Sequence, residues 1–318
     1  YEIPLRLVGS EMCIRDRTTR WIDAEMSSLD AAISKMESVV IADSDGENTT
    51  QYLNWETGRV FEKNQTIDIR EKHMEFNCVS FSYDKIIPGE QLVEGIQHKY
   101  NGIVIVYSDG AHVNYIIDKF TNAKFILRKL LSYAGKKEIA PNEYAITSDL
   151  FLWMIKKVYE DNNDIEQEDG ALLSIDSVSG FKGDSEDMKT TVIAKGESLM
   201  NLISTLSFVL ESKRINQIKI SLQYSEHENI EAVLNTKPSL DIKDKKYLGA
   251  FLWDGNNDII LTRAKLYLLM YLDIIPRLLQ AYYTEKDNDL WNNEVKKSFF
   301  RELGEELTRK ISERIEEE

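Results

Sequence analysis

Apolar and polar residues alternate along several short segments in the first half of the chain, and this two-residue period predicts β-strands. Such segments cover residues 52–61 and 74–83. Two more, residues 103–108 and 111–118, flank Asp109-Gly110, a dipeptide that favours a tight two-residue hairpin. The pattern therefore predicts an antiparallel sheet built around this hairpin.

A longer period, close to 3.6 residues, marks three helices in the same half. Residues 22–40 show it weakly. Residues 122–134 show it clearly, with a capping Thr or Asn at their start and Gly135 as the stop. Residues 149–159 follow Ser148, the expected cap, and are apolar on nearly every side. A helix that is apolar all round is expected to be buried.

The second half predicts the order strand, strand, helix, strand, strand, and then helices to the end. The strands lie near residues 172–181, 190–194, 215–224 and 230–234, and the helix covers residues 197–212. From residue 258 onward the pattern is helical, and we expect a break near Pro276, which lacks the backbone donor of a helix interior. Asp273 and Arg277 stand four apart in this region, a spacing that predicts an ion pair within one helix.

These elements indicate an α+β fold in two lobes, each an antiparallel-rich sheet with packed helices, followed by a helical C-terminus. Residues 160–187 hold ten acidic residues and one basic residue. Their first part has almost no apolar side chain to bury, which is typical of a solvated linker. We therefore predict lobes at residues 18–160 and 171–318, joined by an acidic linker at residues 161–170.

Residues 1–17, YEIPLRLVGSEMCIRDR, are set apart by their origin. The stretch LVGSEMCIRD is the translation of a transposase sequencing adapter. We therefore expect these residues to be foreign to the protein and to contribute nothing to its fold.

Charge and cysteine content restrict the functional classes. The formal net charge is −15, which argues against a protein that coats nucleic acid or anionic membranes over its whole surface. Outside the adapter segment, Cys78 is the only cysteine, so an intramolecular disulfide is excluded and a reducing cytoplasm is expected. The most apolar run, residues 266–275, is about half the ~20 residues that a membrane span needs.

The segment at residues 119–137 carries six basic residues and no acidic one. On a helical projection its apolar residues fill one side, while Phe125 lies among the cations on the other. A ring between cations suits phosphate contact combined with base stacking. The alternative is that Phe125 packs under the hairpin and the cations are merely solvated. The predicted binding residues are Lys124, Phe125, Arg128, Lys129, Lys136 and Lys137.

A second hypothesis is a metal-dependent nuclease. Glu211 and Lys213 have the acidic-x-Lys spacing that such enzymes use to hold a cation and activate water, and Asp176 is the candidate partner acid. Against it, the Glu-x-Lys falls at the end of a predicted helix and such a pair arises easily by chance in a chain with 29% charged residues. The sequence contains no phosphate-binding glycine motif, and we expect no cofactor and no metal site.

Apolar residues recur every four positions in the last helix, among charged neighbours. A helix this charged is marginal alone, so its apolar row must be buried, either on its own lobe or at an oligomer or partner interface. The row is formed by Trp291, Val295, Phe299, Leu303, Leu307, Ile311 and Ile315.

Taken together, these features favour a non-enzymatic cytoplasmic binding or adaptor protein that contacts nucleic acid or an acidic partner through the basic helix, without a membrane. The nuclease is the first alternative. The second is a structural or accessory component of a phage, mobile-element or defence-associated assembly.

Overall fold

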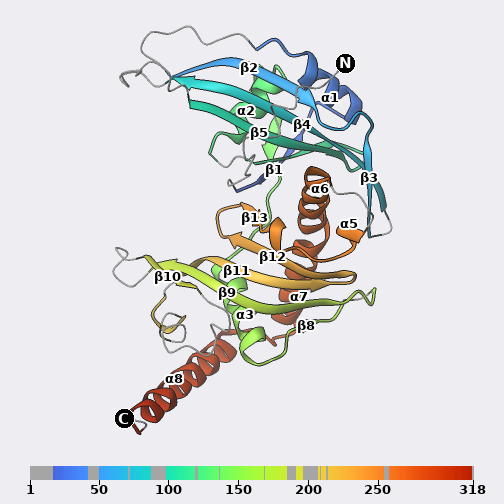
Figure 1. Cartoon of the computed structure of the whole chain (residues 1–318). Coiled ribbons are helices and arrows are strands. Elements are labelled where there is room, and N and C mark those ends of the chain that lie inside the picture. The colour runs from blue at the N-terminus through green and yellow to red at the C-terminus, as the bar shows by residue number, and fades with distance from the viewer. Residues whose placement is uncertain are drawn as a thin grey trace. The chain divides into compact units, whose positions relative to one another are not determined.

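The computed structural model divides the chain into two compact units, residues 1–143 and 144–318 (Figure 1). Both units combine antiparallel sheets with packed helices, and the chain ends in a helix, so the predicted α+β fold is confirmed. The structure describes residues 17–41, 50–70, 72–86, 98–118, 121–135, 137–167, 169–184, 191–195, 207, 209–212, 214–253 and 258–316. The adapter segment, apart from Arg17, lies outside these residues.

The first unit is built on a seven-stranded antiparallel sheet, counted over the described residues. Its order is β2 (Gln51–Arg59), β4 (Lys72–Ile86), β5 (His98–Ser108), β6 (Val113–Ile117), β1 (Thr19–Asp23) and β7 (Ile139–Pro141). The remaining strand, β3 (Gln65–Ile69), pairs with the first half of β4. The expected hairpin is β5–β6. Its loop has four residues instead of two, because Ser108 pairs with Val113. The Asp109 carboxylate closes the loop by accepting hydrogen bonds from the backbone N–H groups of Ala111 and His112.

Helices α1 (Leu29–Ser38) and α2 (Ala123–Leu130) cover one face of this sheet (Figure 1). Ile33 and Met36 of α1 and Leu127 of α2 share one core with Val104 and Tyr115 of the strands. The helix predicted over residues 22–40 is wrong in its first part. Residues 22 and 23 belong to β1, where pairing with both β6 and β7 overrides the weak helical spacing.

The second unit has a six-stranded antiparallel sheet, again counted over the described residues. Its order is β10 (Thr191–Lys195), β9 (Leu173–Asp184), β11 (Arg214–Tyr224), β12 (His227–Asn235) and β13 (Leu240–Ile242), with β8 (Asp164–Ile165) paired to β9. Most of the helix predicted between β10 and β11 lies outside the described residues. The short helices are η3 (Asp244–Lys246) and α5 (Ala250–Trp253).

One face of the second sheet packs against α3 (Ser148–Tyr159). Thr147 caps this helix by accepting a hydrogen bond from the Leu150 N–H, so the predicted cap, Ser148, is wrong by one residue. The Ser148 hydroxyl instead accepts from the Ile215 N–H of β11. The buried apolar side of α3 includes Leu150 and Phe151.

The helices that follow run without the break expected at Pro276. A π-helical turn, Met270–Ile274, links α6 (Ile259–Leu269) to α7 (Ile275–Asp287). In this wider turn the Ile275 N–H donates to the Met270 carbonyl, five residues earlier. Pro276 therefore stands in the first turn of α7, where a missing N–H is tolerated. Among the described residues, no helix is both long and apolar enough to cross a membrane.

The predicted ion pair between Asp273 and Arg277 is confirmed, with 2.7 Å between Oδ1 and Nε and both side chains buried. Arg277 also binds Asp169 with two nitrogens, and the Tyr224 hydroxyl donates to Asp273. Asp169 thus ties the acidic segment to α7, and β8 adds that segment to the sheet. The chain passes from the first unit to the second between residues 143 and 144, whereas the sequence placed the boundary at residues 161–170.

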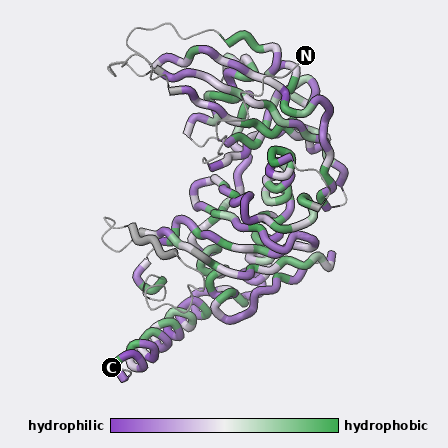
Figure 2. The backbone as a smooth tube through the Cα atoms, in the orientation of Figure 1, coloured by the Kyte–Doolittle hydropathy of each residue, from purple (hydrophilic) through white to green (hydrophobic). Residues whose placement is uncertain are grey.

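The last helix, α8 (Asn293–Glu316), is docked on its own unit only over its first turns. The carboxylate of Asp149 on α3 accepts hydrogen bonds from Trp291 Nε1 and Lys296 Nζ, and Phe299 and Leu303 are fully buried. Figure 2 shows hydrophobic positions recurring along α8 among hydrophilic ones. The last two of them are exposed, Ile311 by 44% and Ile315 by 70%.

Candidate functional site

Helix α2 presents the predicted basic side to the surface of the first unit. Ala123, Ile126, Leu127 and Leu130 point into the core. Lys124, Phe125, Arg128 and Lys129 lie on the remaining sides and are half-buried. Four of the six predicted binding residues therefore share one helix surface. Lys137 is exposed beyond the end of the helix, and Lys136 lies outside the described residues.

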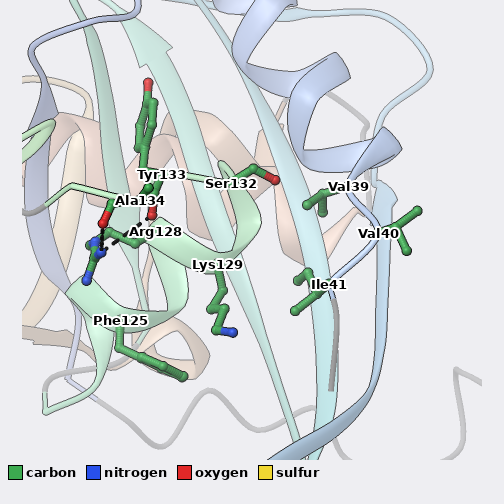
Figure 3. A pocket seen from close by; sticks show the side chains of 9 residues that line it. All are labelled: Val39, Val40, Ile41, Phe125, Arg128, Lys129, Ser132, Tyr133 and Ala134. Carbon is green, nitrogen blue, oxygen red and sulfur yellow. Dashed lines mark hydrogen bonds between the residues drawn. The ribbon is translucent and has the colours of Figure 1, made fainter. Parts of the chain in front are cut away.

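A groove of about 350 Å³ runs beside this surface (Figure 3). One wall is the segment that follows α1, and the other is formed by α2 and the turn after it. The lining, as far as the chain is described, contains two cations and two aromatic rings but no carboxylate. It is made of Val39, Val40, Ile41, Phe125, Arg128, Lys129, Ser132, Tyr133 and Ala134.

The two cations of the lining differ in the contacts that they form. Arg128 donates from one nitrogen to the carbonyl oxygens of Ala134, at 2.8 Å, and Tyr133, at 3.5 Å. It therefore closes the turn after α2 and supports the groove wall. Lys129 reaches toward Phe125, with its Nζ 5.9 Å from the ring centroid. Within the described part of the chain, neither Lys129 nor Lys124 forms an ion pair, so both charges are available to an anion.

Tyr133 fixes the far end of the groove. Its hydroxyl donates to the fully buried carboxylate of Asp23, which also accepts from the Tyr115 hydroxyl at 2.6 Å. Burial, and then the hydrogen bond to Asp23, raise the pKa of the Tyr133 hydroxyl, so the ring stays neutral at physiological pH. The ammonium of Lys35 lies 4.2 Å from the Tyr133 ring centroid. This end of the groove is therefore an aromatic wall with Lys35 beside it and the carboxylates of Asp23, Glu25 and Glu138 close to Tyr133.

Phe125 belongs both to the groove and to the edge of the core. Its ring centroid lies 4.6 Å from that of Tyr52 on β2. The sequence offered packing under the β5–β6 hairpin as the alternative for Phe125, and its ring contacts Tyr52 of β2 instead. A further cluster of rings, Tyr52, Trp55, Tyr83 and Tyr100, continues from this contact on β2, β4 and β5.

The sequence did not point to these four rings as a group, because they share one face only through a β-bulge that interrupts the alternation of β2. Between Leu53 and Glu56 the strand β2 contains one residue more than its partner, β4. Asn54 lies within this bulge and has a φ of 53°. Without a bulge, Tyr52 and Trp55 would point to opposite faces, since they are three positions apart. With it, both lie beside Tyr83.

The residues of the nuclease hypothesis are not brought together where the structure describes them. Asp176 lies on β9, and Glu211 precedes Arg214, which pairs with Asp184 at the far end of β9. The eight residues from Asp176 to Asp184 span roughly 25 Å of strand. Lys213 lies outside the described residues. No group of three or more histidine, cysteine or acidic side chains in the described chain has the geometry of a metal site.

A second cavity, of about 510 Å³, lies within the second unit between the acidic segment and α7. Its cations are already neutralised. Arg277 is held by Asp169 and Asp273, and Lys157 pairs with Glu285 at 2.6 Å. The groove beside α2 is therefore the better candidate, because Lys129, which lines it, forms no ion pair with any described residue.

No protein-family model matches the sequence, and none of the curated proteins matches it.

Proposed function

We propose that this protein binds single-stranded nucleic acid through the groove beside α2. The observation that carries the proposal is the composition of the groove: Phe125 and Tyr133 stand next to Lys129 and Arg128, and no described carboxylate lines it. Phosphates are bound by cations whose charge is not neutralised, and unpaired bases stack on aromatic rings.

A single strand fits this site better than a duplex. The cationic surface is one helix of two turns, and the net charge of −15 repels a long stiff polyanion elsewhere on the protein. A flexible strand can follow a short local patch. Phe125 can also stack only on a base that is not already stacked in a duplex. We assign the phosphate contacts to Lys124 and Lys129, and we assign a supporting role to Arg128.

The test is charge reversal of the two lysines to which we assign the phosphate contacts. Lys124→Glu with Lys129→Glu should weaken binding of a fluorescently labelled oligothymidylate of about 20 nucleotides, measured by anisotropy, by roughly tenfold or more. The wild-type affinity should fall with salt, with a slope of about −0.7 per phosphate contacted. The matched control is Lys63→Glu with Lys72→Glu, which makes the same change in net charge at two exposed lysines of the same unit.

Three results would contradict the proposal: a wild type without salt-sensitive binding, an equal loss in the control variant, or tighter binding of a polyglutamate peptide than of the oligonucleotide. The last result would point to an acidic protein partner at the same groove.

A further inference from the structure

One end of the first sheet carries rings and basic side chains on the face that α2 covers. Residues paired directly across an antiparallel ladder point to the same face. Tyr83 pairs with Tyr100, Lys85 pairs with His98, and Tyr52 pairs with Lys85. Since Tyr83 belongs to the core under α1 and α2, all five residues lie on the helix-covered face, at its end.

Three of the rings form a stack across neighbouring strands. Trp55 of β2 lies 4.5 Å from Tyr83 of β4, with 28° between their planes. Tyr83 lies 5.4 Å from Tyr100 of β5, with 11° between theirs. The middle ring is buried, with 1% of its surface exposed, while Tyr100 is 38% exposed. The stack therefore ends in an accessible ring at Tyr100.

This stack is continuous with the groove. The Phe125 ring, which lines the groove, contacts Tyr52 at 4.6 Å, and Tyr52 lies 5.7 Å from Tyr83. Each step from Phe125 to Tyr100 therefore joins rings less than 6 Å apart. Lys85 is half-buried beside this path and forms no ion pair with any described residue.

One acidic side chain near this path, Asp118, is buried in the interior of the unit. A Cβ placed on Gly102, which follows Tyr100 on the same face, would lie 2.4 Å from Asp118 Oδ1. Asp118 therefore lies beside Gly102, further into the sheet than Tyr100, and the residue is 5% exposed. It belongs to the interior of the unit, whereas Tyr100 and Lys85 stand at its rim.

We propose that Tyr100 is a second stacking platform for the same ligand. A base of the strand held at α2 continues the ring stack of Trp55, Tyr83 and Tyr100. Lys85 then contacts the sugar-phosphate backbone of that strand. This inference rests on the proposed function and makes it more specific. The ligand becomes a single strand of several nucleotides whose bases are unpaired at both ends of the path, and a lone nucleotide would use only half of the site.

The experiment compares three substitutions of Tyr100 with one control. Tyr100→Phe keeps the planar ring, Tyr100→Leu keeps an apolar side chain without a stacking face, and Tyr100→Ala removes the side chain. The control is Tyr283→Ala, which removes a tyrosine of similar exposure, 42%, on α7 in the other unit. Binding is measured with the labelled 20-nucleotide oligothymidylate, and stacking with the fluorescence of an oligonucleotide that contains 2-aminopurine.

We expect Tyr100→Leu and Tyr100→Ala to weaken binding by about tenfold, which is within the range for loss of one base–aromatic stack. Tyr100→Phe and Tyr283→Ala should bind like the wild type. Binding should quench 2-aminopurine in the wild type and in Tyr100→Phe, and less in Tyr100→Leu. Because Tyr100 is at the rim, thermal unfolding of the leucine variant should match that of the wild type, which separates lost stacking from lost folding.

Wild-type affinity and quenching in Tyr100→Leu would overturn the inference. If the lysine double variant still lost binding in that case, the groove would stand as the binding site without the Tyr100 platform. If neither set of variants lost binding, the proposed function itself would be wrong.

Discussion

At the scale of single residues, the sequence predicted which side chains of α2 face away from the core, but not the hydrogen bonds that they form. Lys124, Phe125 and Lys129 were found because a helical projection separates them from the core side of α2. Arg128 lies on the same surface, but its guanidinium is used by the backbone of the following turn. Projection alone cannot show this, because the turn geometry depends on tertiary packing. The rings of β2, β4 and β5 were missed for the same reason, since their common face depends on a bulge.

Another residue-scale feature affects how the stability of the fold depends on pH. His227 of β12 is buried, with its Nδ1 2.7 Å from the Tyr247 hydroxyl and its ring 4.6 Å from that of Phe251. Burial lowers the pKa of His227 to about 4, from an ordinary value of 6.5. Between these two pKa values, the unfolded chain binds a proton at His227 and the folded state does not.

We predict that His227 makes the protein less stable as the pH falls from 6.5 to 4. In this window the unfolded state binds one proton more than the folded state, so the free energy of unfolding decreases by up to about 1.4 kcal/mol per pH unit for this group. Above pH 6.5 both states are neutral at this residue and the contribution is constant. Urea denaturation at several pH values should show a shallower slope for His227→Gln. An unchanged slope would show that the side chain titrates normally.

At the scale of elements, the long strands were predicted, while several helix ends and five short strands were not: β1, β3, β7, β8 and β13. Alternation is clearest in β11, which buries every second residue over much of its length. The start of α1 and the expected break at Pro276 failed, since both depend on pairing or turn geometry that a local pattern does not contain. The apolar row of α8 was visible in the sequence, but the point where its burial stops was not.

For α8 we predict a sharp difference between two truncations. Ending the chain after Lys297 removes Phe299 and Leu303, both fully buried, and should lower the free energy of unfolding by about 3–6 kcal/mol. Ending it after Thr308 removes only the exposed part of the row and should change that free energy by less than about 1 kcal/mol. Chemical denaturation measures both. Equal losses would contradict the conclusion that only the first turns of α8 are docked. A shift from oligomer to monomer when the chain ends after Thr308 would identify an interface at Ile311 and Ile315.

At the scale of the whole molecule, the two-lobed α+β fold followed from the order of elements, while the boundary did not. Composition suggested a linker at residues 161–170, because that segment is acidic and nearly free of apolar residues. Its charge is instead used structurally, since Asp169 binds the buried Arg277. Helix α3, assigned by composition to the first lobe, is bonded to β11 through Ser148 and to α7 through the indole N–H of Trp153, which donates to Glu285.

This boundary can be tested with fragments. We predict that residues 144–318 fold alone, with cooperative thermal unfolding, because α3 stays with the sheet and helices that it contacts. Residues 171–318 should not, since they lack α3 and leave the apolar face of β9 and β11 uncovered. Circular dichroism and size-exclusion chromatography would distinguish the two. A folded 171–318 fragment together with an unfolded 144–318 fragment would restore the acidic segment as the boundary.

The bulge at Asn54 makes a single inserted residue responsible for where two rings point. Among related sequences, loss of one position between Tyr52 and Trp55 would leave every aromatic residue in place and still turn one of the two rings to the other side of the sheet. Aromatic identity in an alignment would then overstate the likeness of two surfaces. The length of this strand would be a better guide to which relatives keep the ring path toward Tyr100.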